Sequence, residues 1–243
     1  MGEVFGITSG KGGVGKSTVS VGLASAFCDM GKEVLLVDMD EGLRCLDLIL
    51  GVDSNTVFDL ADALMGKELE DVLYPISQIK GLSLIPAPSK VGMIDAFSFT
   101  AFAKEVAERF DIVIFDFPAG IDLELYNCLP KDSLFLTVAV PDPVSVRDAA
   151  AISRELEEKK LKARLIINRY SYNRRGRRKS GEIDGIIDSA SLQLLGIVPE
   201  SEELLLLSLN HGIKKRCKAF AAFKRIARRL DGVHILLPKV KKI

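Results

Sequence analysis

The sequence has few cysteines and no long hydrophobic run. Its four cysteines are scattered, with no Cys-x-x-Cys pair, which argues against a zinc ribbon or an iron–sulfur carrier and is typical of reduced thiols in the cytosol. The longest apolar runs, such as 134–140, are too short to span a membrane. A strand-like segment begins at Glu3, so we expect no secretory leader. The two histidines, His211 and His234, are isolated, and we expect both to be structural or surface residues.

No charge of one sign dominates, because 33 basic residues balance 33 acidic residues. The balance conceals a division along the chain. Residues 1–159 hold 13 basic and 26 acidic residues, whereas residues 160–243 hold 20 basic and 7 acidic residues. An excess of cations in one part of a chain can mark a surface that faces a polyanion. The charge pattern indicates where such a partner would bind, but it does not identify the activity.

Short apolar runs alternate with helix-like segments, and this alternation indicates the fold class. Most runs are nearly continuous in Val, Ile, Leu and Phe, as expected for strands that helices cover on both faces. The spacing predicts an α/β protein with a doubly wound, largely parallel sheet and helices on both faces. The predicted strands are 4–8, 34–38, 82–86, 111–116, 134–140, 164–168 and 194–198, and the predicted helices lie near 17–30, 56–64, 95–109, 122–128, 143–158, 183–190, 200–208 and 214–230.

The domain organisation follows from what separates these segments. No internal repeat and no Gly/Ser-rich linker divides the chain, so we expect residues 1–231 to form a single domain and residues 232–243 to form a short basic tail. One low-complexity segment, 171–181, is rich in arginine and punctuated by glycine. It is too polar for an internal element, so we expect an exposed loop there.

The strongest signal is a glycine-rich segment that fits the pattern G-x-x-x-x-G-K-[ST]. It lies between an apolar strand and an amphipathic helix, as a phosphate-binding loop requires. Its glycines let successive backbone N–H groups face a phosphate, and the positive end of the next helix adds to that field. Lys16 is expected to contact the β- and γ-phosphates, Ser17 to ligate Mg²⁺, and Thr18 to help bind phosphate. The segment consists of Gly10, Lys11, Gly12, Gly13, Val14, Gly15, Lys16 and Ser17.

The same segment also satisfies G-x-G-x-x-G, the pattern of a dinucleotide-binding fold. In that alternative, Asp38 stands near the position of the acid that binds a ribose. The alternative leaves Lys16 and Ser17 unexplained and makes no use of the acids that follow. We therefore favour a phosphate loop, with a glycine-rich turn bearing surface lysines as the remaining alternative.

Two acids that follow apolar runs complete a predicted magnesium–nucleotide site. Asp116 ends the run 112–116, which has the form of a Walker B element, and Asp40 follows the run 34–38. Carboxylates at the C-terminal ends of parallel strands point into the crevice where ligands bind. Such acids can instead cap a helix or a turn. Asp38 fits a structural role of this kind, whereas the phosphate loop favours metal binding by Asp40 and Asp116.

Lys11 distinguishes this loop from ordinary phosphate loops. With this second lysine, the segment resembles the deviant Walker A motif of the MinD/ParA ATPases. Further motifs resemble MinD-like members of that family in the same order along the chain, and the resemblance spans about residues 3–215. The matching segments are DMDEGLRCLD at 38–47, DFPAGI at 116–121, PDPVSVRD at 141–148, NRY at 168–170 and GIVPE at 196–200.

The resemblance implies a P-loop ATPase with ATP or ADP and Mg²⁺ as ligands, which forms an ATP-dependent homodimer. It implies that Lys11 contacts the ATP of the partner subunit, as an arginine finger does. Asp40 would orient the attacking water and contact the magnesium shell, and Asp116 would hold Mg²⁺ through water. The expected catalytic residues are Lys11, Lys16 and Asp40. The residues expected to border the adenine are Asn168, Arg169 and Pro199.

The resemblance also implies a switch between an ATP-bound dimer and an ADP-bound monomer, which positions the cell-division machinery. Turnover would be slow until a protein partner of the MinC or MinE type acts. The chain departs from the family at Cys45, where Asn is usual, and in the strongly basic segment 171–181. It also departs in its tail, which Pro238 interrupts and which is short for an interfacial helix.

The last predicted helix, 214–230, carries eight basic and no acidic residues. Its apolar residues recur at helical spacing, so we expect it to dock on the sheet with a solvated basic face. Two alternatives give that face a partner: an anionic membrane surface, attracted by helix and tail, or DNA phosphate, contacted also by the arginines of 171–181. The apolar residues are Phe220, Phe223, Ala227 and Leu230.

These features leave three functional hypotheses. The first is a MinD-like ATPase switch in the cytoplasm, or peripheral at the inner face of the cell membrane. The second is a ParA-type partitioning ATPase that acts on DNA. The third is a metabolic P-loop synthetase that phosphorylates a carboxylate. The motif order favours the first hypothesis.

Overall fold

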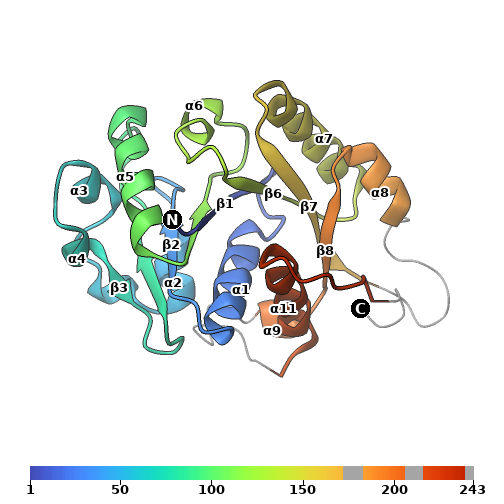
Figure 1. The fold of residues 1–243 in the computed structure, drawn as a ribbon, viewed down its shortest axis with the longest axis horizontal. Coiled ribbons are helices and arrows are strands. Elements are labelled where there is room, and N and C mark those ends of the chain that lie inside the picture. The colour runs from blue at the N-terminus through green and yellow to red at the C-terminus, as the bar shows by residue number, and fades with distance from the viewer. Residues whose placement is uncertain (172–182, 206–215, 239–243) are drawn as a thin grey trace.

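The computed structural model describes residues 1–171, 183–205 and 216–238. These residues contain an eight-stranded sheet in the order β3-β4-β2-β5-β1-β6-β7-β8, with helices on both faces (Figure 1). Its neighbouring strands are parallel, except that β3 runs antiparallel to β4. The predicted α/β fold with a doubly wound, largely parallel sheet is therefore confirmed. The strands are β1 (Glu3–Thr8), β2 (Val34–Asp38), β3 (Tyr74–Pro75), β4 (Leu82–Ile85), β5 (Ile112–Asp116), β6 (Leu134–Ala139), β7 (Lys162–Tyr170) and β8 (Leu194–Pro199).

Most helices lie where the sequence predicts them. The elements that the sequence did not predict are η1, α2, α4 and β3, which have two to six residues each, too few to show a periodic pattern. Outside the described residues lie 172–181 of the basic segment, the end of the helix predicted at 200–208, the start of the helix predicted at 214–230, and the end of the tail. The helices are α1 (Lys16–Asp29), α2 (Cys45–Leu50), the 3₁₀ helix η1 (Asp53–Asn55), α3 (Leu60–Leu64), α4 (Leu69–Val72), α5 (Ala96–Arg109), α6 (Leu123–Tyr126), α7 (Pro143–Glu158), α8 (Ile183–Ala190), α9 (Glu202–Leu205) and α11 (Lys218–Leu230).

The helix predicted at 56–64 begins later than expected. In the structure, α3 starts at Leu60, because Asp59 takes the N-cap position. The Asp59 carboxylate accepts a hydrogen bond from the backbone N–H of Ala61, at 2.9 Å, and thereby satisfies a helix N–H group that has no partner within the helix.

The central strands bury side chains on both faces of the sheet. In β2, Val34 and Leu36 pack in one apolar cluster with α1 and α11, whereas Leu35 and Val37 pack in a second cluster with α5. All four side chains are fully buried. Chemistry at this sheet is therefore confined to the loops at the two ends of its strands. None of the described helices is long and apolar enough to cross a membrane.

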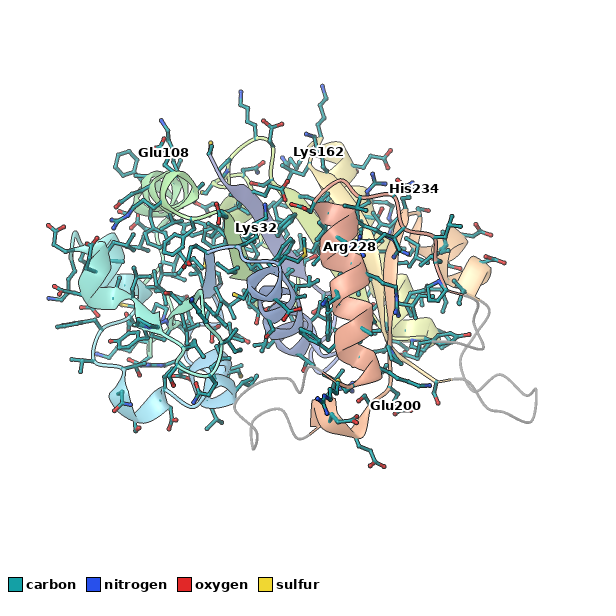
Figure 2. The ribbon with its side chains drawn as sticks, turned by 60° about the horizontal axis from the view of Figure 1, so that its bottom comes forward. Lys32, Glu108, Lys162, Glu200, Arg228 and His234 are labelled. Atoms are coloured by element: carbon teal, nitrogen blue, oxygen red, sulfur yellow. The ribbon has the colours of Figure 1, made fainter. Side chains whose placement is uncertain are left out.

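The first helix differs from the amphipathic helix expected. Residues 19–27 of α1 are all buried, because α11 covers the side of α1 that faces away from the sheet. The two helices lie side by side in both views (Figures 1 and 2). Their contact is close: a Cβ atom at Gly22 would meet the Phe223 ring at 2.4 Å. As predicted, α11 docks through its apolar residues, since Phe220 and Phe223 are buried.

We expect Gly22→Ala to destabilise the protein although alanine is the better helix former. The gain in helix propensity is about 1 kcal/mol, whereas forcing an extra carbon into a packed contact costs about 1–3 kcal/mol. Urea unfolding followed by circular dichroism should therefore give a lower midpoint. Gly185 of α8 is the matched control, because a Cβ there meets no atom within 4 Å. Gly185→Ala should raise the midpoint; equal midpoints for the two variants would contradict the packing argument.

Candidate active site

The glycine-rich loop joins the C-terminal end of β1 to the start of α1. Gly13 and Gly15 have φ angles of 79° and 86°, which residues with a side chain rarely adopt. Cβ atoms at Gly12 and Gly13 would meet no atom within 4 Å, so the backbone is open there. A backbone that curls before a helix N-terminus, with space over its glycines, fits a bound phosphate.

Asn168 of β7 fixes the other side of the loop. Its Nδ2 donates a hydrogen bond to the carbonyl oxygen of Val14, at 2.8 Å, and a Cβ on Gly15 would lie 2.4 Å from the same nitrogen. The Asn168 Oδ1 is buried and has no hydrogen-bond partner among the described residues. An unpaired acceptor in this position fits the predicted role of Asn168 beside the amino group of a base.

The residues predicted to border the adenine meet in one small cavity. Its volume is about 90 Å³, and it lies beside the first turn of α1. Thr18 contributes to it from α1, and Arg169 contributes from the strand end with a φ angle of 52°. The structure thus brings the predicted base-side residues to the same end of the sheet as the phosphate loop. The lining residues are Thr18, Asn168, Arg169, Pro199, Glu200, Ser201 and Leu204.

Asp116 ends β5 next to the loop, and a buried network holds it. Its Oδ1 accepts hydrogen bonds from Lys16 Nζ at 3.2 Å and from Ser20 Oγ at 2.8 Å. The second oxygen, Oδ2, is buried without a partner among the described residues. Because buried carboxylate oxygens are normally hydrogen-bonded, a water molecule of a hydrated Mg²⁺ ion fits this position. Ser20 was not predicted from the sequence, where its only signal is its place one helical turn after Lys16.

Asp38 lies beside Asp116, because the two residues are paired in the register of β2 and β5. Its two carboxylate oxygens accept hydrogen bonds from the backbone N–H groups of Asp40 and Leu46, both at 3.0 Å. Burial, and next the negative charge of Asp116, raise the pKa of Asp38 to about 7, although both N–H groups and Lys16 oppose the rise. Because both carboxylate oxygens of Asp38 already have backbone partners, neither oxygen is left for a ribose. This arrangement disfavours the dinucleotide alternative and fits a structural role for Asp38.

Asp40 follows in the turn that Asp38 fixes. It is half-buried, and burial is the main cause that raises its pKa; the charge of Lys16 opposes that rise and the charge of Asp116 adds to it. The next residue, Glu41, anchors the turn to a second loop. Its carboxylate accepts hydrogen bonds from three successive backbone N–H groups, 92–94, at 2.7–2.9 Å. Glu41 was not predicted from the sequence, because its partners lie about 50 residues away.

Two further predicted residues lie at the open side of the loop. Lys11 is exposed, and no ion pair or hydrogen bond to its ammonium group occurs within the part of the chain described. Ser17 is half-buried in the first turn of α1. The described residues contain no cluster of three His, Cys, Asp or Glu side chains that could hold a metal ion. Mg²⁺ often binds through one or two carboxylates together with substrate phosphates. Ser17, together with Asp40 and Asp116, fits that arrangement.

Comparison with known proteins identifies the family. The family model of the CobQ/CobB/MinD/ParA nucleotide binding domain matches residues 5–212. The septum site-determining protein MinD of Bacillus subtilis is 34% identical to this chain, over 98% of this chain and 92% of that protein. The protein of the same name from Thermotoga maritima is 32% identical, over 96% of this chain and 89% of that protein.

Solved structures agree with this assignment. The MinD cell division protein of Aquifex aeolicus has a TM-score of 0.85 and 31% identity, and the match covers 98% of this chain and 100% of that one. The septum site-determining protein MinD of Pyrococcus horikoshii, solved in complex with Mg-ADP, has a TM-score of 0.82 and 28% identity, with 95% and 96% covered. The chain therefore belongs to the MinD/ParA family of nucleotide-binding P-loop ATPases.

Proposed function

We propose that this chain is a MinD-like ATPase that switches between two states in the spatial control of cell division. The observation that carries the proposal is the ion pair of Lys16 with Asp116 next to the glycine-rich loop. Lys11, in the same loop, is exposed. The names of the relatives support the cell-division role. A solved complex of MinC and MinD from Aquifex aeolicus, with a TM-score of 0.86 and 32% identity, supports a protein partner of the MinC type.

In this proposal, binding of ATP rearranges the buried ion pair. Lys16 exchanges the Asp116 carboxylate for the β- and γ-phosphates, to which the loop N–H groups and the N-terminus of α1 also donate. Ser20 keeps its hydrogen bond to Asp116 and holds that carboxylate in place. The oxygens of Asp116 are then available to water molecules of the magnesium shell, and Ser17 supplies a hydroxyl ligand. When bound, Mg²⁺ neutralises charge that develops on the phosphates.

Hydrolysis in this proposal depends on positioning more than on covalent chemistry. Asp40 orients the attacking water, because its turn is fixed by Asp38 on one side and by Glu41 on the other. Lys11 reaches the ATP of a second copy of the chain and stabilises the transferred charge there. A lysine supplied by the partner subunit couples dimerisation to hydrolysis. ATP then acts as a timer, and turnover is slow until a protein partner stimulates it.

The basic residues of α11 bear on the alternative of a DNA-binding ATPase. Lys224 forms an ion pair with Asp29 at 2.7 Å, and Arg229 donates hydrogen bonds to the carbonyl oxygens of Leu195 and Ile235. These two cations contribute to the packing of α11 against its neighbours. Arg228 stays exposed (Figure 2), and 172–182 lies outside the described residues. No observation here favours the metabolic synthetase.

The tail, 232–243, is a better candidate for a membrane contact than α11 is. The division of the chain into an ATPase domain at 1–231 and this tail stays a prediction. Leu236 and Leu237 are 77% and 45% exposed, and the sequence continues with Lys239, Lys241 and Lys242. Exposed leucines next to lysines are typical of a segment that touches anionic lipid. We propose that the protein acts in the cytoplasm and, in its ATP state, at the inner face of the cell membrane.

Lys11→Ala and Lys16→Ala are both expected to abolish ATP-dependent dimerisation. The Lys16 variant loses a phosphate contact in its own subunit, whereas the Lys11 variant should still bind ATP but lack the contact across the dimer. Light scattering with ATP should give the monomer mass for both variants. Lys80→Ala is the control, because Lys80 is exposed and far from the loop; it should dimerise normally. ATP-bound dimers of both variants would refute the assignment.

Asp40→Ala is expected to trap ATP and the dimer. Without the carboxylate that orients water, phosphate release should slow by roughly 10²–10⁴-fold, while the monomer–dimer equilibrium shifts towards the dimer. Phosphate release under single-turnover conditions measures the first effect, and light scattering measures the second. Asp53→Asn, on the exposed η1 turn, is the control. Hydrolysis by the Asp40 variant at the wild-type rate would contradict the proposed role.

A chain that ends at Asp231 is expected to lose binding to anionic vesicles. At about 1 kcal/mol per lysine near the membrane surface, three lysines correspond to roughly a hundredfold in affinity. Pelleting with phosphatidylglycerol vesicles, in ATP and in ADP, compares the full chain with the shortened one. Equal pelleting of both chains would show that the tail is not the segment that binds the membrane. A gel shift with non-specific DNA in ATP, without vesicle binding, would favour the DNA-partitioning alternative instead.

A further inference from the structure

A second cavity lies at the end of the sheet opposite the phosphate loop. Its volume is about 710 Å³, and it opens among the N-terminal ends of β1, β6 and β7 and the end of α11. The strand register explains the space. β1 begins at Glu3, whereas β6 begins at Leu134, which is level with Phe5. Glu3 and Val4 therefore have strand partners only in β5, and their other side is open to the cavity.

The size and the walls of this cavity suit an apolar body. Small-molecule sites commonly have volumes of about 300–1,000 Å³ and mostly apolar walls with a few polar groups. The volume here falls within that range. Apolar side chains reach it from the three strands β1, β6 and β7, from the segment before β6 and from the last helix. They belong to Val4, Phe5, Pro130, Leu134, Ala163 and Leu230.

Two polar groups that line the cavity lack partners. Ser133 is 4% exposed, and its Oγ makes no hydrogen bond among the described residues. Leaving a buried hydroxyl unpaired costs about 1–3 kcal/mol, so the position favours a bound acceptor or donor. Arg164, near the start of β7, is half-buried, and no ion pair or hydrogen bond to its guanidinium occurs within the described ranges. A guanidinium presents a planar set of donors that matches a carboxylate or a phosphate.

The charges around the cavity leave Arg164 without an anion. Lys131 and Lys162 are exposed at the rim; Lys162 is labelled in Figure 2, at the start of β7. Asp132 is 99% exposed and pairs with Lys162 at 3.0 Å. Glu3 is the other acid of the lining; burial, and next the charge of Asp231, raise the pKa of its carboxyl. Cations thus outnumber acids among these lining residues, and within the described ranges the ion pair at the rim involves Lys162 and not Arg164.

We propose that this cavity, called here the Arg164 cavity, binds a small organic anion with an apolar body. The carboxylate or phosphate head of the ligand contacts the Arg164 guanidinium and accepts a hydrogen bond from the Ser133 hydroxyl. The body of the ligand lies between Val4 and Leu230. The proposal does not depend on the nucleotide chemistry, because the phosphate loop lies at the other end of the same strands. The site could therefore be occupied while the nucleotide site is empty or filled.

The test uses the full chain, labelled with ¹⁵N, and four probes. Sodium octanoate carries a carboxylate head and monooctyl phosphate a phosphate head, so the two probes distinguish the head groups. 1-Octanol is the uncharged probe with the same body, and acetate is the head without the body. We expect amide shifts at Glu3, Val4, Ser133 and Ala163 with one or both octyl anions. Neither octanol nor acetate should produce them at the same concentration.

The variants separate recognition of the head group from general hydrophobic binding. Arg164→Gln should weaken binding of the octyl anion at least tenfold, which is about 1.4 kcal/mol, and Ser133→Ala should weaken it severalfold. Arg154→Gln is the matched control, because Arg154 is an exposed arginine on α7 outside the cavity. Arg164→Lys keeps the charge and should bind with intermediate affinity. A native amide spectrum and unchanged ATP hydrolysis show that each variant is folded.

Three results would overturn the proposal. The first is that Arg164→Gln binds the octyl anions as tightly as Arg154→Gln does. The second is that octanol binds as tightly as octanoate, which would mean that the cavity binds the octyl chain without recognising the anionic head group. The third is that the shifts appear at residues 10–17 instead, which would mean that the anions occupy the phosphate loop. Tight binding that needs both Arg164 and the octyl body supports the site.

Discussion

The buried ion pair between Lys16 and Asp116 is the interaction on which the active site depends. The two side chains are 8% and 1% exposed, so each buried charge is compensated by the other. Removing one partner of such a pair typically costs about 3–5 kcal/mol. A ligand that takes Lys16 from Asp116 must therefore supply equivalent charge to both. A phosphate for the lysine together with a hydrated cation for the carboxylate meets this condition, and either one alone does not.

The sheet determines where such chemistry is available. Because helices cover both faces, its polar groups are available only at the two ends of the strands. At the C-terminal ends, the register places Asp38 and Asp116 side by side, and the loop after β1 adds its N–H groups. At the N-terminal ends, unequal strand lengths leave the Arg164 cavity. One arrangement of strands thus produces two adjacent carboxyl groups at one end and, among the described residues, a guanidinium without a partner at the other.

From the sequence we predicted the fold class, which the structure confirms, because it depends on strand–helix alternation. The loop residues 10–17 and the acids Asp40 and Asp116 came from local motifs, and their roles stay predictions. The two hydrogen bonds that Asp38 accepts from backbone N–H groups could not be predicted. They depend on the register of β2 with β5 and on the path of the turn up to Leu46, which the sequence does not show. Ser20 and Glu41 were missed for the same reason: their partners lie far away in sequence. The burial of α1 on every side was also hidden, because α11, which covers it, comes some 200 residues later.

The contact between Gly22 and Phe223 has a mechanical consequence. α1 begins at the phosphate loop and is about 21 Å long, at 1.5 Å per residue over 14 residues. Its middle is locked to α11 without space for even one extra carbon atom, and its end is tied to α11 by the pair of Asp29 and Lys224. The two helices are therefore packed as one unit. Any displacement of α1 would require α11 to move with it or the contact between Gly22 and Phe223 to open.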